Sequence, residues 1–178
     1  MIQTLISSKT RVKLLIKFFL NSDTKSYLRN LETEFGESTN AIRLELNKFE
    51  KAGMLLSEQE GNRKYFKANT RHPLFQDINN IVFKYVGLDW IIDHIAGKLG
   101  NLRKVYLTGS FANGLDSDSI DLIFVGTIDE MFLKELCNKV KKKVNKEISC
   151  RTVDEGDLIL MMKEETGSKY LLLWENEK

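Results

Sequence analysis

Several residue types are scarce in this 178-residue chain, and each scarcity excludes a class of protein or a kind of site. There is one proline, Pro73, and there are two cysteines and two histidines. The spacing of Cys137 and Cys150 fits no metal or redox motif, so we expect both to be reduced thiols. No apolar run approaches the ~18 residues that a membrane span requires. We therefore expect no membrane association.

The remaining composition is that of a globular protein. Apolar residues make up 42%, charged residues 29% and aromatic residues 10% of the chain, which places it far from the disordered class. Residues 1–6 show no basic region and no small-residue cleavage site, which argues against a secretory signal. We expect a cytoplasmic protein.

Charge is unevenly distributed along the chain. Residues 1–72 carry 13 Lys and Arg against 8 Asp and Glu, a net charge of +5. Residues 73–178 carry 14 against 17, a net charge of −3, and the two sum to the total of +2. A basic first part joined to an acidic second part suggests two roles, the first on a polyanion.

Apolar periodicity in the first part predicts three helices. The first spans 10–21 and is capped by Ser8 or Thr10, and the second spans 27–35 and ends at Gly36. The third opens at Ser38 or Thr39 and ends at Gly53. Two short helices joined by a tight turn are typical of a helix-turn-helix.

The third predicted helix has a candidate DNA-reading face. At about 100° per residue, Asn40, Arg43 and Asn47 cluster away from its apolar stripe. Arginine pairs with guanine and asparagine with adenine in the major groove of DNA. The alternative is an ordinary solvated helix face.

A hairpin is predicted directly after this helix, with strands at 54–59 and 63–68 and a turn at 60–62. Asn62, Arg63 and Lys64 lie near its tip, where basic side chains can reach phosphates beside the groove that a helix occupies. Such a hairpin is the wing of a winged helix. The order of these elements resembles the winged-helix regulators of the arsenic-repressor-like group, and the matching segments are 27–31, 38–46, 49–55 and 61–66.

Residues 73–100 are predicted to join two domains. Pro73 disfavours helix at His72, which we interpret as a linker residue. Two helical stripes follow, one through 74–85 and one through 90–99, and His94 on the second is expected to be a surface or packed residue. These helices either pair two chains or cover the sheet of the second domain.

The second part carries a recognisable motif. A predicted strand at 105–108 leads into Gly109, Ser110 and Gly114, and a second strand begins at Ser119. This pattern resembles the polymerase-beta-like minimal nucleotidyltransferases, with G-S-x-A-x-G followed by S-D-I-D-L. The resemblance implies a Gly-Ser turn that binds triphosphate, and two aspartates on one strand face that hold Mg²⁺.

The aspartate pair is incomplete here. Asp121 is present, but Ser119 stands at the position of the first aspartate, and Asp118 falls on the opposite strand face. The strand expected to supply a third carboxylate, 148–153, has none, although Glu147 precedes it. We therefore predict no catalytic residues, no metal ligands and no cofactor.

Three segments complete the second part. A lysine run between Lys139 and Lys146 is expected to form a solvated helix face. Residues 158–162 are predicted to be a buried helix or strand, and 170–174 a buried final strand.

The sequence as a whole predicts a mixed α+β protein with three parts. These are a winged helix-turn-helix at 1–72, a helical linker at 73–100 and a nucleotidyltransferase-like domain with a mixed sheet at 101–178. The favoured function is a homodimeric transcriptional regulator binding double-stranded DNA, with a catalytically degenerate sensor or assembly domain. The DNA-binding candidates are Thr39, Asn40, Arg43, Asn47, Asn62, Arg63 and Lys64, and the candidates for a small phosphate-bearing ligand are Gly109, Ser110 and Asp121.

Two alternatives stay open. One is an active nucleotidyltransferase that uses Mg²⁺ and a nucleoside triphosphate to modify a protein or small molecule, with the winged helix recruiting partners. The other is a protein-interaction module with a large apolar surface around residues 74–99.

Overall fold

The computed structural model describes residues 6–95, 101–164 and 169–176. The chain divides into two compact units, the first formed by 1–85 with 114–116 and the second by 86–113 with 117–178. Residues 1–5, part of the segment used to argue against a signal, and Leu99 of the second helical stripe lie outside the described residues. Within those residues, every helix is too short or too polar to span a bilayer.

Three helices form most of the first unit. Ser8 caps the first of them by accepting a hydrogen bond from the Arg11 backbone N–H, and Gly36 ends the next in the left-handed conformation at φ 61°. Ser38 caps the last by accepting from the Ala41 N–H. Their bounds are α2 (Lys9–Leu15), which continues into the π-helical turn η1 (Ile16–Leu20), α3 (Leu28–Phe35) and α4 (Thr39–Lys51).

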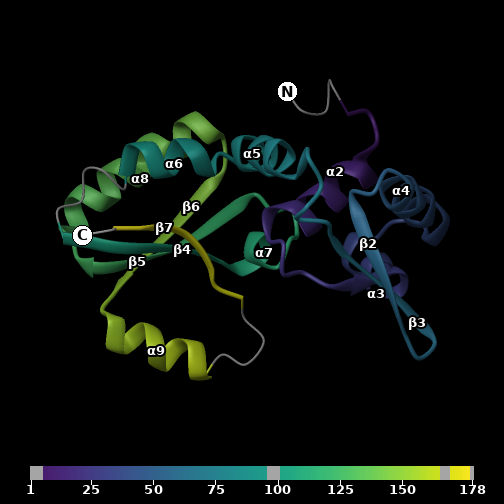
Figure 1. Cartoon of the computed structure of the whole chain (residues 1–178). Helices are drawn as coiled ribbons and strands as arrows, with labels where there is room; N and C mark the ends of the chain where they lie inside the picture. Colours follow the sequence, from purple (N-terminus) through teal and green to yellow (C-terminus); the bar gives the residue numbers. More distant parts are fainter. Residues whose placement is uncertain (1–5, 96–100, 165–168, 177–178) are drawn as a thin grey trace. The chain divides into compact units, whose positions relative to one another are not determined.

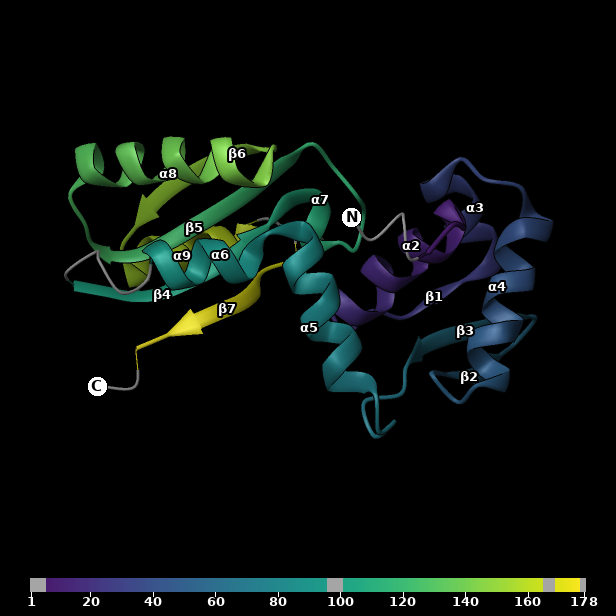
Figure 2. The ribbon, with the colours of Figure 1, turned by 90° about the horizontal axis from the view of Figure 1, so that it is seen from above.

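A small antiparallel sheet completes this unit, in the order β1-β3-β2. Its strands are β1 (Ser26–Tyr27), β2 (Leu55–Glu60) and β3 (Arg63–Ala68). The hairpin β2–β3 was predicted, whereas β1 was not, because two residues carry no strand periodicity. Figure 2 shows α4 beside this hairpin, consistent with the packing of α4 on β2.

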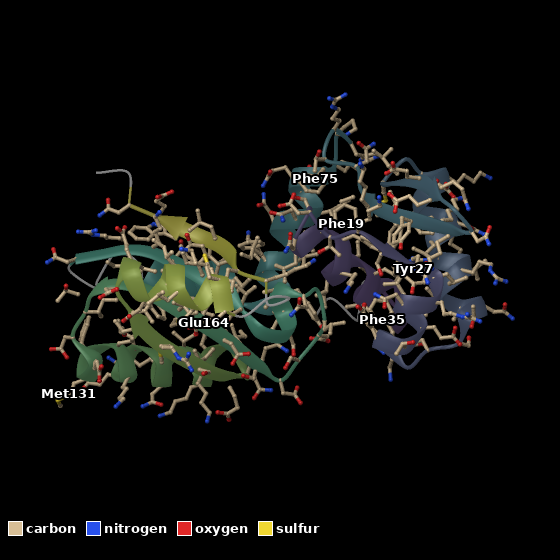
Figure 3. All side chains as sticks on the ribbon, turned by 90° about the horizontal axis from the view of Figure 1, so that it is seen from below. Phe19, Tyr27, Phe35, Phe75, Met131 and Glu164 are labelled. Atoms are coloured by element: carbon tan, nitrogen blue, oxygen red, sulfur yellow. A yellow bond between two sulfur atoms is a disulfide. The ribbon has the colours of Figure 1, made fainter. Side chains whose placement is uncertain are left out.

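Aromatic packing holds α5 (Phe75–Val86) against the helices of the first unit. The ring of Phe19 lies 6.5 Å from that of Phe49 and 5.7 Å from that of Phe75, between ring centroids. Phe19 and Phe75 lie near each other in Figure 3. The His72 ring also has a structural role, because its Nδ1 accepts a hydrogen bond from the Leu74 backbone N–H just before α5 begins.

The second unit is built on a four-stranded mixed sheet, as predicted. Its order is β6-β5-β4-β7, with β5 and β6 parallel and the other neighbours antiparallel. The strands are β4 (Asn101–Thr108), β5 (Ser119–Thr127), β6 (Glu147–Val153) and β7 (Leu171–Glu175).

Helices cover both faces of this sheet. Figure 1 shows α6 and α8 on one face and α9 on the other, in agreement with the packing of α8 on β6 and of α9 on β5. On α6, the His94 ring stacks on Trp90 at 3.8 Å between centroids, so this histidine is a packed residue. The helices are α6 (Leu88–Ile95), α7 (Gly109–Ala112), α8 (Glu130–Val144) and α9 (Glu155–Glu164).

Three sequence predictions for this unit were wrong. Cys137 on α8 and Cys150 on β6 form a disulfide rather than two thiols, because the packing of α8 against β6 brings together residues whose spacing matched no motif. In α9 only Leu158 is buried, since the helix lies on the sheet along one side. The strand β7 is an edge strand, and its residues are exposed or half-buried.

Candidate functional site

The exposed face of α4 carries the helix residues that the sequence singled out. Burial of Ile42, Leu46 and Phe49 fixes the orientation of the helix in the first unit. The opposite face then leaves Asn40 and Arg43 exposed, with Arg43 Nη1 donating to Asn40 Oδ1 at 3.4 Å. A side-chain hydrogen bond of this kind limits the freedom of the guanidinium before any ligand arrives.

The tip of the β2–β3 hairpin presents a second set of polar side chains. Gly61 adopts φ 57°, a left-handed conformation that glycine takes without strain and that a two-residue turn requires. Behind the tip, the Arg63 guanidinium lies over the Tyr27 ring at 4.8 Å from the centroid. Lys64 Nζ pairs with Glu50 Oε2 of α4 at 2.7 Å. These contacts orient the hairpin relative to α4.

A groove of about 810 Å³ brings the two sets together within the first unit. Six of the seven predicted DNA-binding residues line it: Thr39, Arg43, Asn47, Asn62, Arg63 and Lys64. Asn40 does not line the groove and reaches it through its hydrogen bond to Arg43.

Sequence reasoning missed three polar residues of this groove, namely Tyr27, Arg29 and Glu32. Tyr27 is held there by β1, through its pairing with Tyr65 of β3. Arg29 and Glu32 follow on α3: exposed Arg29 lies on the face turned away from the buried Leu31, and half-buried Glu32 lies at the edge of that face, next to the buried Phe35. The amphipathic pattern of α3 indicates that this face is polar. It does not indicate a groove, because the hairpin that closes the groove comes from a distant part of the sequence.

Positive charge dominates the groove. Of its five ionisable Arg, Lys and Glu residues, Glu32 alone is acidic. A hydrogen bond with Tyr65 raises the pKa of Arg63, and the nearby Tyr27 and Tyr65 phenols act in the same direction, so the guanidinium stays charged. The Lys64 hydrogen bond, with that of Ser57, lowers the pKa of Glu50. A cationic groove of this size is suited to a polyanion.

Ion pairs behind the groove tie α4 to α2. Glu45 is buried at 6% exposure, and Arg11 Nε donates to its Oε2 at 2.8 Å while Lys48 Nζ donates to its Oε1 at 3.1 Å. Burial acts to raise the pKa of Glu45, but the hydrogen bonds and charges of Arg11 and Lys48 outweigh it and leave the pKa below its ordinary value. The groove wall therefore depends on a buried ionised carboxylate.

A second, smaller pocket of about 210 Å³ lies in the second unit, where β4 passes through Gly109 into α7. Gly109 has φ 66°, and a Cβ there would lie 2.3 Å from Asp121 Oδ2, so only glycine permits this close approach. Gly109 and Asp121 line the pocket and Ser110 does not.

This pocket lacks the carboxylates that a two-metal site requires. Asp121 accepts a hydrogen bond at 3.2 Å from the hydroxyl of Ser119. Its partner in the parallel register of β6 is Ser149, and Arg151 also lines the pocket. Within the described residues there is no group of three or more His, Cys, Asp or Glu side chains able to hold a metal. The residues present do not fit Mg²⁺ coordination of the two-metal kind.

The other acidic candidates lie elsewhere in the second unit. The Asp118 carbonyl accepts from the Glu147 N–H at 2.8 Å, and both residues line a third pocket that does not include Asp121. Glu147 pairs with Lys141 of α8 at 2.5 Å. Neither carboxylate replaces the one missing at Ser119.

Comparison with known proteins yields structural neighbours only. No protein-family model matches the chain, and no curated protein matches it. The HEPN toxin–MNT antitoxin complex of Shewanella oneidensis contains a chain with 21% identity and a TM-score of 0.37, over 51% of this chain and 71% of that one. A candidate nucleotidyltransferase from Sulfolobus solfataricus has 28% identity and a TM-score of 0.36, over 53% and 82%.

A protein of Archaeoglobus fulgidus has 20% identity and a TM-score of 0.38, over 46% of this chain and 93% of its own. One of these three neighbours is described as a nucleotidyltransferase, and another is a complex of a toxin with its antitoxin. At TM-scores below 0.5, these likenesses assign no activity to the present chain.

Proposed function

We propose that the first unit is a winged helix-turn-helix that binds double-stranded DNA, and that the chain is a transcriptional regulator acting in the cytoplasm. The observation that carries this proposal is the cationic groove that α4 and the tip of the β2–β3 hairpin line together. A helix and a basic hairpin around one groove supply the base-reading and phosphate-binding parts that sequence-specific recognition needs.

In the proposed complex, α4 enters the major groove, which is about 12 Å wide and admits one helix. Asn40, Arg43 and Asn47 contact base edges there, with Arg43 suited to guanine and the asparagines to adenine. Arg63 and Lys64 bind phosphates beside the helix, while Thr39 and Asn62 supply further polar contacts. The Lys64–Glu50 ion pair keeps the lysine near the groove until a phosphate is present.

For the second unit we propose a catalytically degenerate sensor or assembly role. Asp121 has hydroxyl neighbours at Ser119 and Ser149 in place of further carboxylates, which argues against metal-dependent transfer. The pocket around Gly109 and Asp121, with Ser110 next to Gly109 in α7, remains our candidate for a small phosphate-bearing ligand.

We also propose that the regulator is a homodimer that pairs through α5. Leu74, just before this helix, and Ile81 within it are 54% and 50% exposed, and their seven-residue spacing places them on one face. Half-buried Ile78 and Tyr85 continue that face. An apolar stripe of this kind suits pairing with the same helix of a second copy.

DNA binding is tested by selecting a preferred duplex from a random pool with the full chain and measuring its affinity across salt concentrations. We expect the logarithm of the binding constant to fall linearly with the logarithm of salt concentration. Arg63→Ala should make this slope shallower by about 0.9, the value for one lost phosphate contact. Lys67→Ala, an exposed lysine of β3 that does not line the groove, is the matched control. Absence of binding even at about 50 mM salt would reject the proposal.

The same preparation tests the enzymatic alternative. Incubation with labelled nucleoside triphosphates and Mg²⁺ or Mn²⁺ should give no incorporation into protein or small molecules. Incorporation that is lost in Asp121→Ala would show that the second unit is an active nucleotidyltransferase.

A further inference from the structure

Leu44 is an apolar residue at the centre of the polar face of α4. It is 57% exposed, whereas Ile42 and Leu46 on the same helix are buried. At about 100° per residue, Leu44 projects about 40° from Asn40 and about 60° from Asn47, on the same side of both asparagines. It lies on the exposed face of α4 outside the groove that the helix shares with the hairpin. The helix thus exposes one large hydrocarbon side chain among the residues proposed to read bases.

The major groove of DNA also presents an apolar group. Its base edges carry hydrogen-bond donors and acceptors, and thymine adds the C5-methyl group, which apolar side chains contact. We infer that Leu44 is a specificity-determining residue that contacts the methyl group of a thymine in the preferred DNA site. The inference rests on the proposed DNA-binding function.

The position of this thymine follows from the helix. Leu44 lies four residues after Asn40, about 6 Å along the axis at about 1.5 Å per residue, against about 3.4 Å per base pair. The thymine therefore lies within about two base-pair steps of the base that Asn40 contacts. The methyl contact adds discrimination at a position that neither asparagine reads.

The test replaces each thymine of the selected duplex, one at a time, by deoxyuridine, which removes the methyl group alone. For the wild-type chain we expect one such replacement, within about two base-pair steps of the base that Asn40 contacts, to weaken binding about fourfold, the effect of one methyl-sized apolar contact. Leu44→Ala should bind the thymine and uracil duplexes equally and at the weaker affinity. Leu160→Ala removes a leucine of similar exposure, 56%, on α9 of the second unit and should keep the wild-type discrimination.

The outcomes separate this inference from the proposed function. If the chain selects a duplex but every uracil replacement binds like the parent, the inference fails and DNA binding stands. If Leu44→Ala keeps the full discrimination between thymine and uracil, or weakens binding to both duplexes by the same factor, Leu44 does not contact the methyl group. If no duplex is selected at all, the proposed function fails and the inference fails with it. Circular dichroism of Leu44→Ala confirms that α4 remains folded, as expected for alanine in an exposed helical position.

Discussion

Individual side chains decide which ligand the groove of the first unit can take. Arg43 and Arg63 belong to a helix and to a strand, and both line the same groove. Their planar guanidinium groups suit different partners: Arg43, hydrogen-bonded to Asn40, is placed to read a base, while Arg63, stacked on Tyr27, is placed to bind a phosphate. The proposed roles predict different consequences for their removal.

Arg43→Ala is expected to weaken binding to the selected duplex by about 1–3 kcal/mol, because a bidentate contact to guanine is lost. It should also relax the base preference at one position of the site, which a repeated selection with the variant measures. Arg71→Ala removes an exposed arginine that does not line the groove and serves as the matched control. A variant that loses affinity without any change in base preference would exclude the base-reading role of Arg43.

The residues of the groove could be predicted from the sequence only in part. Arg43 and Asn47 follow from the helical period, and Asn62, Arg63 and Lys64 follow from the hairpin tip at Gly61. Arg29 and Glu32 were missed because their place in the groove depends on tertiary pairing of β1 with β3. In the second unit, the substitution at Ser119 was visible in the sequence. The placement of Ser149 opposite Asp121 required the parallel register of β5 and β6.

At the scale of elements, α4 depends on its connections to α2. Arg11 and Lys48 neutralise the buried Glu45, and Lys13 on α2 pairs with Glu37 just before α4 at 2.9 Å. The Lys13 hydrogen bond, assisted by that of Thr10, lowers the pKa of Glu37. Because both carboxyl groups have a lower pKa in the folded chain than their ordinary value of 4.5, their stabilisation is present above about pH 4.5 and is lost as the pH falls through the folded pKa values.

Glu45→Gln should therefore reduce the sensitivity of the first unit to acid. At pH 7 we expect it to lower the free energy of opening of α4 by about 1–3 kcal/mol, because Arg11 and Lys48 lose an ionised partner. As the pH falls below about 4.5, its stability should change less than that of the wild type. Amide hydrogen exchange of α4 is the appropriate measurement, since Trp90 and Trp174 both lie in the second unit and their fluorescence does not report on the first. Arg11→Met should show the same reduced pH dependence, and an unchanged dependence in both variants would contradict this account.

Elements with strong local signals were the ones that the sequence predicted well. The third helix was recognisable from a cap at Ser38 or Thr39, its apolar stripe and Gly53, and in the structure Ser38 is the cap of α4. The pairing of β1 and the burial of α9 could not be predicted, because both depend on tertiary contacts. The two residues of β1 pair with a strand some forty positions away, and the apolar residues of α9 do not indicate which of them face the sheet.

At the scale of the whole molecule, the proposed homodimer predicts a dependence of assembly on α5. Ile81→Asp places a charge in the apolar stripe and should convert the dimer to a monomer, because an unpaired carboxylate in a buried interface is strongly unfavourable. Analytical ultracentrifugation of both proteins measures this change. Ile159→Asp is the matched control, since Ile159 is 52% exposed on α9 of the second unit and should leave the dimer intact. A wild-type chain that is monomeric at all concentrations would refute the proposed dimer.

The central claim is that the groove of α4 and the β2–β3 hairpin binds DNA, and the affinity of the full chain for its selected duplex tests it most directly. The decisive comparison is between the wild type and a variant with Arg43, Asn47 and Arg63 all replaced by alanine. We predict a fall in affinity of at least about 100-fold at moderate salt, from the loss of two base contacts and one phosphate contact. Equal affinity of the two proteins, or no selection of any duplex by the wild type at low salt, would contradict the claim.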